Sequence, residues 1–170
     1  MKKLLIIALL FLGQYSFAQL EVSRDASGNK VLKGFISKKE LSADTAFVWY
    51  AQNQKGYIPN AEVIQQYAAN KDSVNLVVFG GTWCGDTQHL LPKFFATTDA
   101  AGVPDNRITL IGVDHSKKTL YNLSEAFGII NVPTFIVMKN GKEIGRVVEY
   151  GKIGSPEKEV AEIITNATKK

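Results

Sequence analysis

The chain has 170 residues, of which 45% are apolar and 21% are charged. These values are typical of one globular domain with a substantial core. The formal net charge is +4, or +2 once Lys2 and Lys3 are left out, and no basic stripe alternates with aromatic residues. A charge this small argues against nucleic acid as a partner.

The first 18 residues have the three-part pattern of a secretory signal peptide. Two lysines precede an apolar run over residues 4–12, and a small-residue cleavage site ends at Ala18. The apolar run is shorter than the ~20 residues that a helix needs to span a bilayer. We therefore expect cleavage near Ala18, a mature chain that starts near Gln19, and a periplasmic or secreted protein that meets the membrane only during export.

Residues 19–73 form an N-terminal extension that we expect to pack on the main domain. Its polar start, residues 19–32, is expected to be loosely held, and "VLKGFIS" (31–37) predicts a short strand. Residues 45–54 favour a helix. Asn60 is placed to cap a further helix, whose apolar residues share one face: Val63, Ile64, Tyr67 and Ala68.

Residues 74–170 carry the clearer signals of an α/β domain. Continuous apolar runs at 74–80 and 108–114 predict buried central strands, and a helix from about Cys84 to Thr98 connects them. Ser116 is expected to cap the next helix, which Gly128 ends. The residues that this helix should turn inward are Leu120, Leu123 and Phe127.

The C-terminal part predicts a hairpin followed by a helix. Asn140-Gly141 between apolar runs is a tight-turn signal. Ser155 and Pro156 start the last helix, whose apolar residues follow helical spacing: Val160, Ile163, Ile164 and Ala167. The order strand–helix–strand–helix–hairpin–helix predicts an α/β fold with a central mixed sheet flanked by helices.

Residues 74–168 resemble the thioredoxin family, because several of its motifs occur in order. Trp83-Cys84-Gly85 stands at a strand-to-helix turn, and Pro92 follows where thioredoxins have a proline in the helix. Phe127-Gly128-Ile129 leads into Val132-Pro133-Thr134, similar to the family's cis-proline motif, and Met138-Lys139-Asn140-Gly141 matches the hairpin after it. The resemblance implies a thioredoxin fold, and "GTWCGDT" with the extension looks like exported thioredoxin-like proteins of Gram-negative bacteria.

Cys84 is the only cysteine in the chain. A cysteine at a helix start is exposed to unpaired backbone N–H groups and to the positive end of the helix dipole, which favour its thiolate. Asp86 opposes this by like-charge repulsion, so we expect only a modest lowering of the Cys84 pKa. Cys84 is the expected nucleophile in attack on a disulfide.

Thr87 occupies the position where the resemblance places a second, resolving cysteine. Helix spacing puts it on the core side, where its hydroxyl needs a hydrogen-bond partner. The Cys84 sulfur, a nearby carbonyl or its own backbone remain open as that partner. Many thioredoxins also carry a buried aspartate six residues before the first cysteine, and this chain has Val78 there. With no internal thiol to release a mixed disulfide, an external thiol is needed.

Val132 and Pro133 are the second part of the expected site. The resemblance implies a cis peptide bond before Pro133, which leaves the Val132 backbone free to pair with an extended substrate. Trp83, Gly85 and Asp86 complete the expected substrate-binding residues. His89 and His115 are interpreted as surface residues, and their separation gives no metal-ligand spacing.

We expect an exported monothiol thiol–disulfide oxidoreductase without cofactor or metal, acting as a monomer. Its expected partners are a disulfide-bearing protein or small thiol, and an external reductant thiol. The alternative is a non-catalytic thioredoxin fold that binds peptides or proteins through the same groove. A third interpretation rests on a faint similarity of Cys-Gly-Asp-Thr to monothiol glutaredoxins, some of which hold an iron–sulfur cluster. A peroxidase is less favoured, because that family places threonine before its cysteine.

Overall fold

The computed structural model describes residues 19–168, so the signal-peptide prediction for residues 1–18 lies outside the described part of the chain. Its centre is a six-stranded sheet with the strand order β1-β2-β4-β3-β5-β6. The strands are β1 (Leu20–Arg24), β2 (Lys30–Ile36), β3 (Asn75–Gly80), β4 (Ile108–Gly112), β5 (Thr134–Lys139) and β6 (Lys142–Val148).

The sheet is mixed, as the sequence predicts. β3 and β4 run parallel, whereas β1–β2, β2–β4, β3–β5 and β5–β6 pair in antiparallel fashion. The two continuous apolar runs form the central strands β3 and β4, because apolar side chains on both faces of a strand need cover on both sides. The α/β fold class with a central mixed sheet is therefore confirmed.

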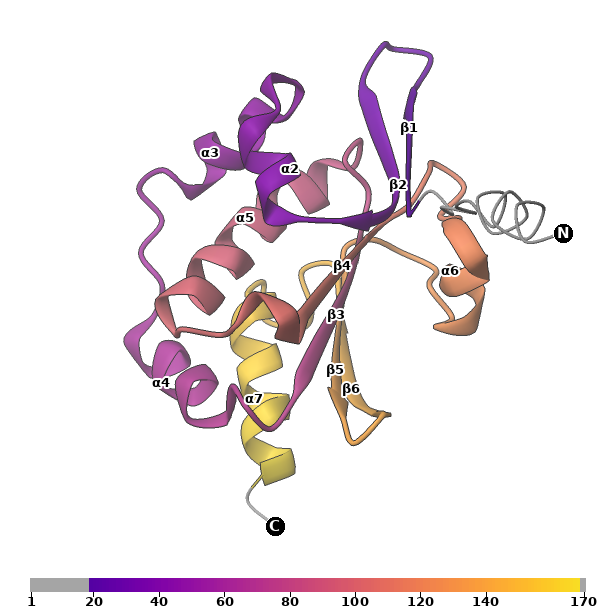
Figure 1. The fold of residues 1–170 in the computed structure, drawn as a ribbon. Coiled ribbons are helices and arrows are strands. Elements are labelled where there is room, and N and C mark those ends of the chain that lie inside the picture. The colour runs from indigo at the N-terminus through magenta and orange to yellow at the C-terminus, as the bar shows by residue number, and fades with distance from the viewer. Residues whose placement is uncertain (1–18, 169–170) are drawn as a thin grey trace, which may run out of the picture.

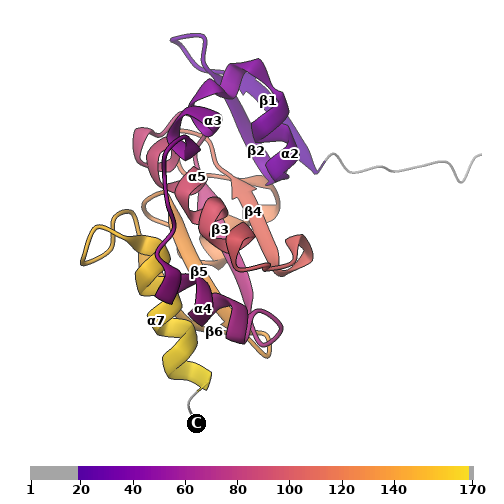
Figure 2. The same ribbon diagram turned by 90° about the vertical axis from the view of Figure 1, so that its left-hand side faces the viewer.

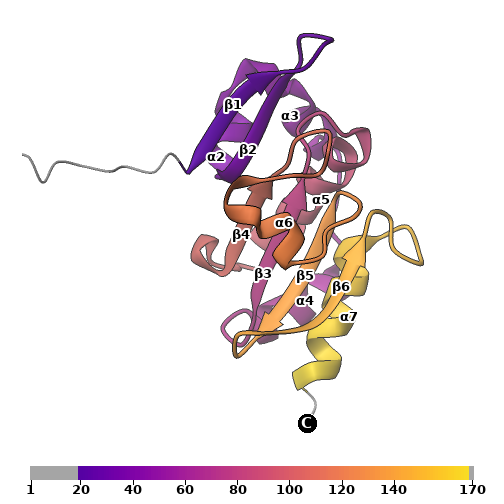
Figure 3. The same ribbon diagram turned by 90° about the vertical axis from the view of Figure 1, so that its right-hand side faces the viewer.

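Helices cover the two faces of the sheet unequally (Figures 1, 2 and 3). Five helices lie on one face, and the short α6 (Leu123–Ala126) lies on the other. The five are α2 (Lys38–Ala43), α3 (Val48–Gln54), α4 (Ala61–Asn70), α5 (Gly85–Ala100) and α7 (Pro156–Thr168). Short 3-10 turns add η1 (Thr45–Phe47), η2 (Asp105–Arg107) and η3 (Leu120–Asn122).

Each face of the sheet has its own apolar core. The larger core lies beneath the five helices and includes Phe94, Phe135 and Tyr67, whose rings contact one another edge-on or tilted. The smaller core lies beneath α6, where the rings of Phe79 and Phe127 have their centroids 5.4 Å apart. The predicted site lies beside the smaller core, since Cys84 and Trp83 pack against it.

The helix and hairpin predictions around the sheet are largely confirmed. Residues 45–54 form η1 and α3, and Asn60 caps α4 by accepting hydrogen bonds from the backbone N–H groups of Glu62 and Val63. Asn140 and Gly141 both have positive φ in the β5–β6 turn, as a two-residue hairpin of this type requires.

The prediction that residues 19–32 are loosely held is wrong. Leu20–Arg24 is strand β1, which pairs with β2 at the edge of the sheet. Most of its side chains are exposed, so apolar periodicity gives no signal; the strand is held by its backbone pairing and by the packing of Leu20. Its register is reinforced beyond the strand, where the Phe35 N–H donates to the Gln19 carbonyl at 2.8 Å.

The predicted helix from Ser116 to Gly128 is also largely wrong. Only η3 and the single-turn α6 form, because Lys117, Tyr121 and Asn122 adopt positive φ. The Asp114 carboxylate accepts the backbone N–H groups of residues 116 and 118, so it ties the start of this segment into a loop. Gly128 does end the helical turn, with φ of +60°.

Within residues 19–168, no helix combines the length and apolar character needed to cross a membrane.

Candidate functional site

Cys84 lies at the N-cap of α5, directly after the turn that leaves β3. Two glycines make this turn possible. A Cβ atom on Gly81 would lie 2.7 Å from the Trp83 ring, and one on Gly80 would lie 2.9 Å from the Thr87 methyl group. The Cys84 N–H donates to the Gly81 carbonyl at 2.9 Å. The cysteine is half-buried, so its sulfur is neither enclosed in the core nor fully open to solvent.

The sulfur of Cys84 contacts the loop that precedes β5. Its Sγ donates to the Val132 carbonyl oxygen at 3.3 Å. The Val132–Pro133 peptide bond is cis. Val132 itself is only 3% exposed and belongs to the smaller core, against which Cys84 packs. The structure thus brings together Cys84, Val132 and Pro133 as the sequence predicts.

Thr87 lies one turn into α5 and forms the floor of the site. Only 1% of the residue is exposed. Its Oγ1 accepts a hydrogen bond from the Gly81 backbone N–H at 3.2 Å, which is none of the three partners that the sequence left open. Val78 is fully buried in the larger core. The residues beneath Cys84 are therefore the hydrogen-bonded Thr87 and the apolar Val78, and neither side chain can act as a thiol.

Trp83 lies next to Cys84, and its indole ring is held by a hydrogen bond at its edge and by a stacked ring on its face. Its Nε1 donates to the Val113 carbonyl at 2.9 Å. The His115 ring stacks on the indole with centroids 4.1 Å apart and an interplanar angle of 21°. The prediction of His115 as a surface residue is correct for its exposure, since 55% of the side chain is accessible, but no local pattern predicts this stacking.

Gly85 and Asp86 form the first turn of α5 beside the cysteine. Gly85 is exposed, and Asp86 is half-buried. Tyr150, from the turn after β6, reaches the same place, and its hydroxyl bonds Asp86. The Tyr150 pKa is raised, first by desolvation and then by the Asp86 charge, by that hydrogen bond and by Cys84. Sequence reasoning missed Tyr150, because no local motif marks it.

The position of Tyr150 follows from a backbone contact to the proline loop. The N–H of Glu149, whose φ is +52°, donates to the Pro133 carbonyl at 2.7 Å. The turn after β6 is thereby tied to the loop before β5, and Tyr150 remains 40% exposed. An aromatic side chain with a protonated hydroxyl thus stands at the rim of the site.

The N-terminal extension also contacts the turn that carries Cys84. The Thr82 hydroxyl donates to the Lys30 carbonyl at 2.9 Å and accepts from the Leu32 N–H at 3.2 Å, both in β2. The Gln88 side chain donates to the Thr82 carbonyl at 2.8 Å, and Asn53 of α3 donates to the Gln88 carbonyl at 3.1 Å. The extension therefore packs directly behind the site.

The remaining predicted features concern metal ligands. His89 is exposed, as predicted, and its Nε2 lies 2.7 Å from the Lys93 ammonium group. Across residues 19–168, no group of three or more histidine, cysteine, aspartate or glutamate side chains is arranged to hold a metal ion.

A mixed sheet with a cysteine at the start of the helix after a central strand, facing a cis-proline loop, defines an α/β protein with the architecture of the thioredoxin class. Comparison with known proteins agrees. The thioredoxin family model matches residues 58–165, and the chain therefore belongs to the thioredoxin family. The match includes α4 and everything from β3 to most of α7, and it leaves β1, β2, α2, η1 and α3 outside.

Individual relatives support the same assignment. The chain is 29% identical to a thioredoxin of Staphylococcus saprophyticus over 94 residues, which are 55% of this chain and 82% of that one. It is 31% identical to a thioredoxin of Echinococcus granulosus over 87 residues, or 51% of this chain and 76% of that one. The crystal structure of an HIV epitope-scaffold shares the fold with a TM-score of 0.54 at 16% identity, covering 75% of this chain and 90% of the other.

Proposed function

We propose that this thioredoxin-family chain is an exported monothiol thiol–disulfide oxidoreductase with Cys84 as its nucleophile. The observation that carries the proposal is the position of Cys84. It is half-buried at the N-cap of α5, with its Sγ 3.3 Å from the Val132 carbonyl beside Pro133. A thiol that is not enclosed in the core can reach a disulfide, which it attacks in its thiolate form.

The proposed exchange has two steps. The Cys84 thiolate attacks one sulfur of a substrate disulfide, forming a Cys84–substrate disulfide while the second substrate sulfur leaves as a thiolate and takes up a proton. A thiolate from an external reductant then attacks the substrate sulfur or the Cys84 sulfur of that mixed disulfide. Attack on the substrate sulfur frees Cys84 as a thiolate and leaves substrate and reductant joined by a disulfide. Attack on the Cys84 sulfur instead releases the substrate thiolate and leaves Cys84 joined to the reductant. In either case a second reductant thiolate attacks the reductant sulfur of that disulfide, which releases the remaining thiolate and forms a disulfide between the two reductant molecules.

An external thiol is required because the residues beneath Cys84 cannot release a mixed disulfide. Thr87 stands at the resolving position and is engaged with the Gly81 N–H, and Val78 offers no base. We assign Val132 and Pro133 to the docking of an extended substrate, because the Val132 backbone faces the sulfur. Trp83, Gly85 and Asp86 border the same surface. The partners are then a disulfide-bearing protein or small thiol and a separate reductant.

Trapping on Cys84 in the native exported compartment tests the proposal. Since the chain has no other cysteine, every disulfide adduct of the protein must involve Cys84. Without an internal resolving thiol, wild type should accumulate mixed disulfides that mass spectrometry identifies after thiol quenching. Cys84→Ser is the matched control, and adducts that persist in it would show that capture is not disulfide exchange. The absence of any adduct in wild type would contradict the proposal.

A second candidate, a non-catalytic peptide-binding module, is favoured by the loss of both resolving groups together. The hydrogen bond that Thr87 accepts from a backbone N–H gives this threonine a structural role at the site. The pH dependence of iodoacetamide labelling separates the candidates. An ordinary alkyl-thiol titration of Cys84 favours the binding module, and labelling that stays fast well below pH ~8.5 favours the oxidoreductase.

The exported location is part of the proposal and has its own test. The charged, apolar and small-residue order of residues 1–18 supports it. Intact-mass measurement of natively produced protein should give a chain that begins at or near Gln19. Retention of Met1 to Ala18 in the mature protein would contradict export by this route.

A further inference from the structure

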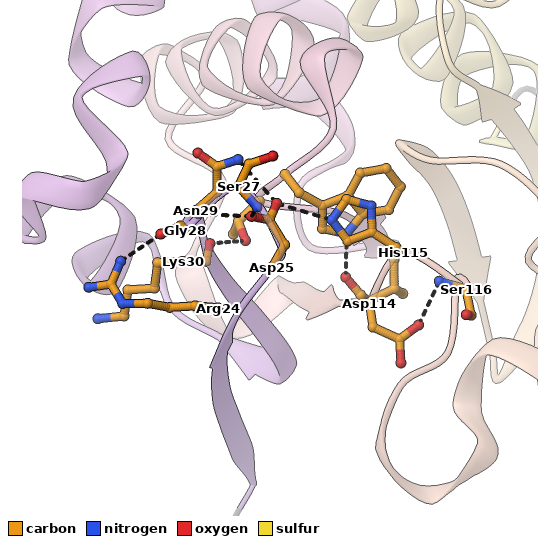
Figure 4. A network of polar contacts seen from close by, with 12 residues as sticks. Arg24, Asp25, Ser27, Gly28, Asn29, Lys30, Asp114, His115 and Ser116 are labelled. Carbon is orange, nitrogen blue, oxygen red and sulfur yellow. Dashed lines mark hydrogen bonds and ion pairs between the residues drawn. The ribbon is translucent and has the colours of Figure 1, made fainter.

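A line of contacts joins the loop between β1 and β2 to the residue before Cys84. Figure 4 shows its start, with the Asp25 carboxylate directed at the His115 ring. His115 Nε2 lies 3.2 Å from Asp25 Oδ2, and the imidazole stacks on Trp83 with ring centroids 4.1 Å apart. Because a carboxylate oxygen only accepts, Nε2 of His115 must carry the proton in this contact.

The Asp25 carboxylate is held in place by hydrogen bonds within its own loop. Its Oδ1 accepts the backbone N–H groups of Ser27 and Asn29, each at 2.9 Å, and its Oδ2 accepts the Asn29 side-chain amide at 3.1 Å. These bonds, led by the Asn29 side chain, lower the Asp25 pKa. The side chain is only 11% exposed. The hairpin loop therefore presents an oriented carboxylate to His115.

His115 would otherwise be a mobile surface side chain, since 55% of it is accessible. Between the carboxylate and the indole it has one orientation, nearly parallel to Trp83 at 21°. The Lys117 ammonium lies 6.0 Å from the Trp83 ring centroid, within the range of a cation–π contact. The Trp83 indole is thus held by its Nε1 bond to Val113 and by the stack on its face.

We propose that the β1–β2 hairpin loop is a positioning element for the Cys84 site. Through Asp25 and His115 it holds Trp83 as a fixed wall against which a substrate disulfide aligns for attack by Cys84. This inference rests on the proposed oxidoreductase function. It assigns a role to the segment that lies outside the matched thioredoxin region, which begins at residue 58. Asp25 and His115 are positioning residues, since they act through Trp83.

The competing explanation is that Asp25 only stabilises its own loop. Variants of His115 separate the two, because His115 makes none of the loop's internal hydrogen bonds. His115→Ala removes the stack, and His115→Phe keeps a flat ring on Trp83 without the carboxylate contact. Asp25→Ala removes both the loop bonds and the orientation of His115. Ser27→Ala is the matched loop control, because only its backbone N–H bonds Asp25.

Two readouts measure the effect, both in a Trp49→Phe background so that Trp83 is the only tryptophan. The first is the fluorescence of Trp83, which reports the stack without any redox chemistry. The second is the rate at which Cys84 reacts with dithiobis-nitrobenzoate, an aromatic disulfide, compared with its rate with iodoacetamide. In the disulfide reaction Cys84 forms a mixed disulfide and releases one nitrothiobenzoate anion, so the released chromophore counts the events.

We expect His115→Ala to shift the Trp83 emission and to lower the rate with the aromatic disulfide about fivefold, the size of effect that one aromatic stack supports. The iodoacetamide rate should change less than about twofold, since that small reagent needs no wall. His115→Phe and Asp25→Ala each break the contact between Asp25 and residue 115. Both should therefore lower the disulfide rate in the same direction as His115→Ala, by a smaller factor because a ring still lies on Trp83. Ser27→Ala should match the background.

Unchanged emission and an unchanged disulfide rate in folded His115→Ala would overturn the proposal. A background disulfide rate in His115→Phe or in Asp25→Ala would also overturn it, because the carboxylate contact from the loop would then not be needed. An equal fall in both rates would overturn it by pointing to general destabilisation. If Cys84 of the unmodified site is inert to every disulfide, the proposed function fails instead. The fluorescence of Asp25→Ala then decides by itself whether the loop positions Trp83.

Discussion

The two sides of Cys84 are built differently. The Trp83 wall (Trp83, His115 and Asp25) is joined by hydrogen bonds and stacking to segments far apart in the chain. The Pro133 wall (Ile130, Val132, Pro133 and Tyr150) combines buried Val132 and Pro133 with two exposed side chains, Ile130 at 80% and Tyr150 at 40% accessible.

The difference indicates which side of Cys84 a partner protein can contact. The extension packs behind and beside Trp83, whereas Ile130 and Tyr150 on the Pro133 wall are exposed, so a partner can contact the Pro133 wall without disturbing the extension. Substitutions behind the Trp83 wall should therefore change the stability of the protein together with the site. Substitutions of exposed residues on the Pro133 wall should change capture of substrates alone.

The largest expected effect is that of Gly112→Ala, at the end of β4 where β2 docks. A Cβ atom there would lie 2.3 Å from the Leu32 carbonyl oxygen and 2.5 Å from Ile36 Cδ1. The extension must shift away from the sheet, and we expect a loss of about 3 kcal/mol in the free energy of unfolding. Denaturant titration measures it. Gly85→Ala, where a Cβ meets nothing within 4 Å, is the stability control. Equal stability of the two variants would contradict the tight docking.

Thr82→Val should have the next largest effect on the Trp83 side. The substitution keeps the shape of a residue that is 5% exposed but removes the hydroxyl that links the Lys30 carbonyl and the Leu32 N–H. Leaving these groups unpaired should cost about 2 kcal/mol of unfolding free energy. Thr82→Ser retains the hydroxyl and should lose less than half as much in the same titration. A stable Thr82→Val would mean that the extension is held mainly by apolar packing.

Thr87→Cys probes the floor between the two walls. Positions 84 and 87 lie one turn apart at the start of α5, so the new thiol should form an internal disulfide with Cys84. Mixed disulfides trapped on Cys84 should fall about tenfold, because an internal thiol competes at high effective concentration. Insulin reduction should rise, although Val78 keeps the gain partial. Thr87→Ser preserves the Gly81 bond without a thiol and should trap like wild type. A folded Thr87→Cys that stays reduced under oxidant would refute the placement of Thr87.

Ile130→Ser should have the smallest effect, confined to the Pro133 wall. Since the side chain is 80% exposed, the free energy of unfolding should change by less than about 0.5 kcal/mol. Trapping of unfolded protein substrates on Cys84 should weaken roughly threefold, because a partner's apolar surface loses a contact. The matched control is Ile58→Ser, 87% exposed between α3 and α4. Identical trapping by both variants would remove Ile130 from the docking surface.

The sequence predicted the parts of the fold that local patterns determine. The apolar runs of β3 and β4, the cap of α4 and the Asn140-Gly141 turn each follow from neighbouring residues, and the structure has them all. Cys84, Val132 and Pro133 come together because the resemblance to thioredoxins covers the sheet that positions them.

The errors arise where distant contacts decide the conformation. β1 has an exposed, polar side-chain pattern, and only its pairing with β2 makes it a strand. Residues 116–127 have helical spacing, but the Asp114 carboxylate and three left-handed residues break the helix. His115 was correctly placed at the surface, yet its partner Asp25 is 90 positions away, and no local signal links the two.

Strand β1 also has a consequence for how copies of the chain meet. It is one of the two edge strands of the sheet, with β6 at the opposite edge, so one row of its backbone N–H and C=O groups faces outward and could pair with another sheet. Its exposed side chains include Glu21 and Arg24, and Glu21 lies 3.8 Å from the Lys33 ammonium group of the neighbouring strand. A second copy that added its own edge here would have to desolvate these charges. The edge thereby discourages sheet-to-sheet aggregation in a crowded compartment.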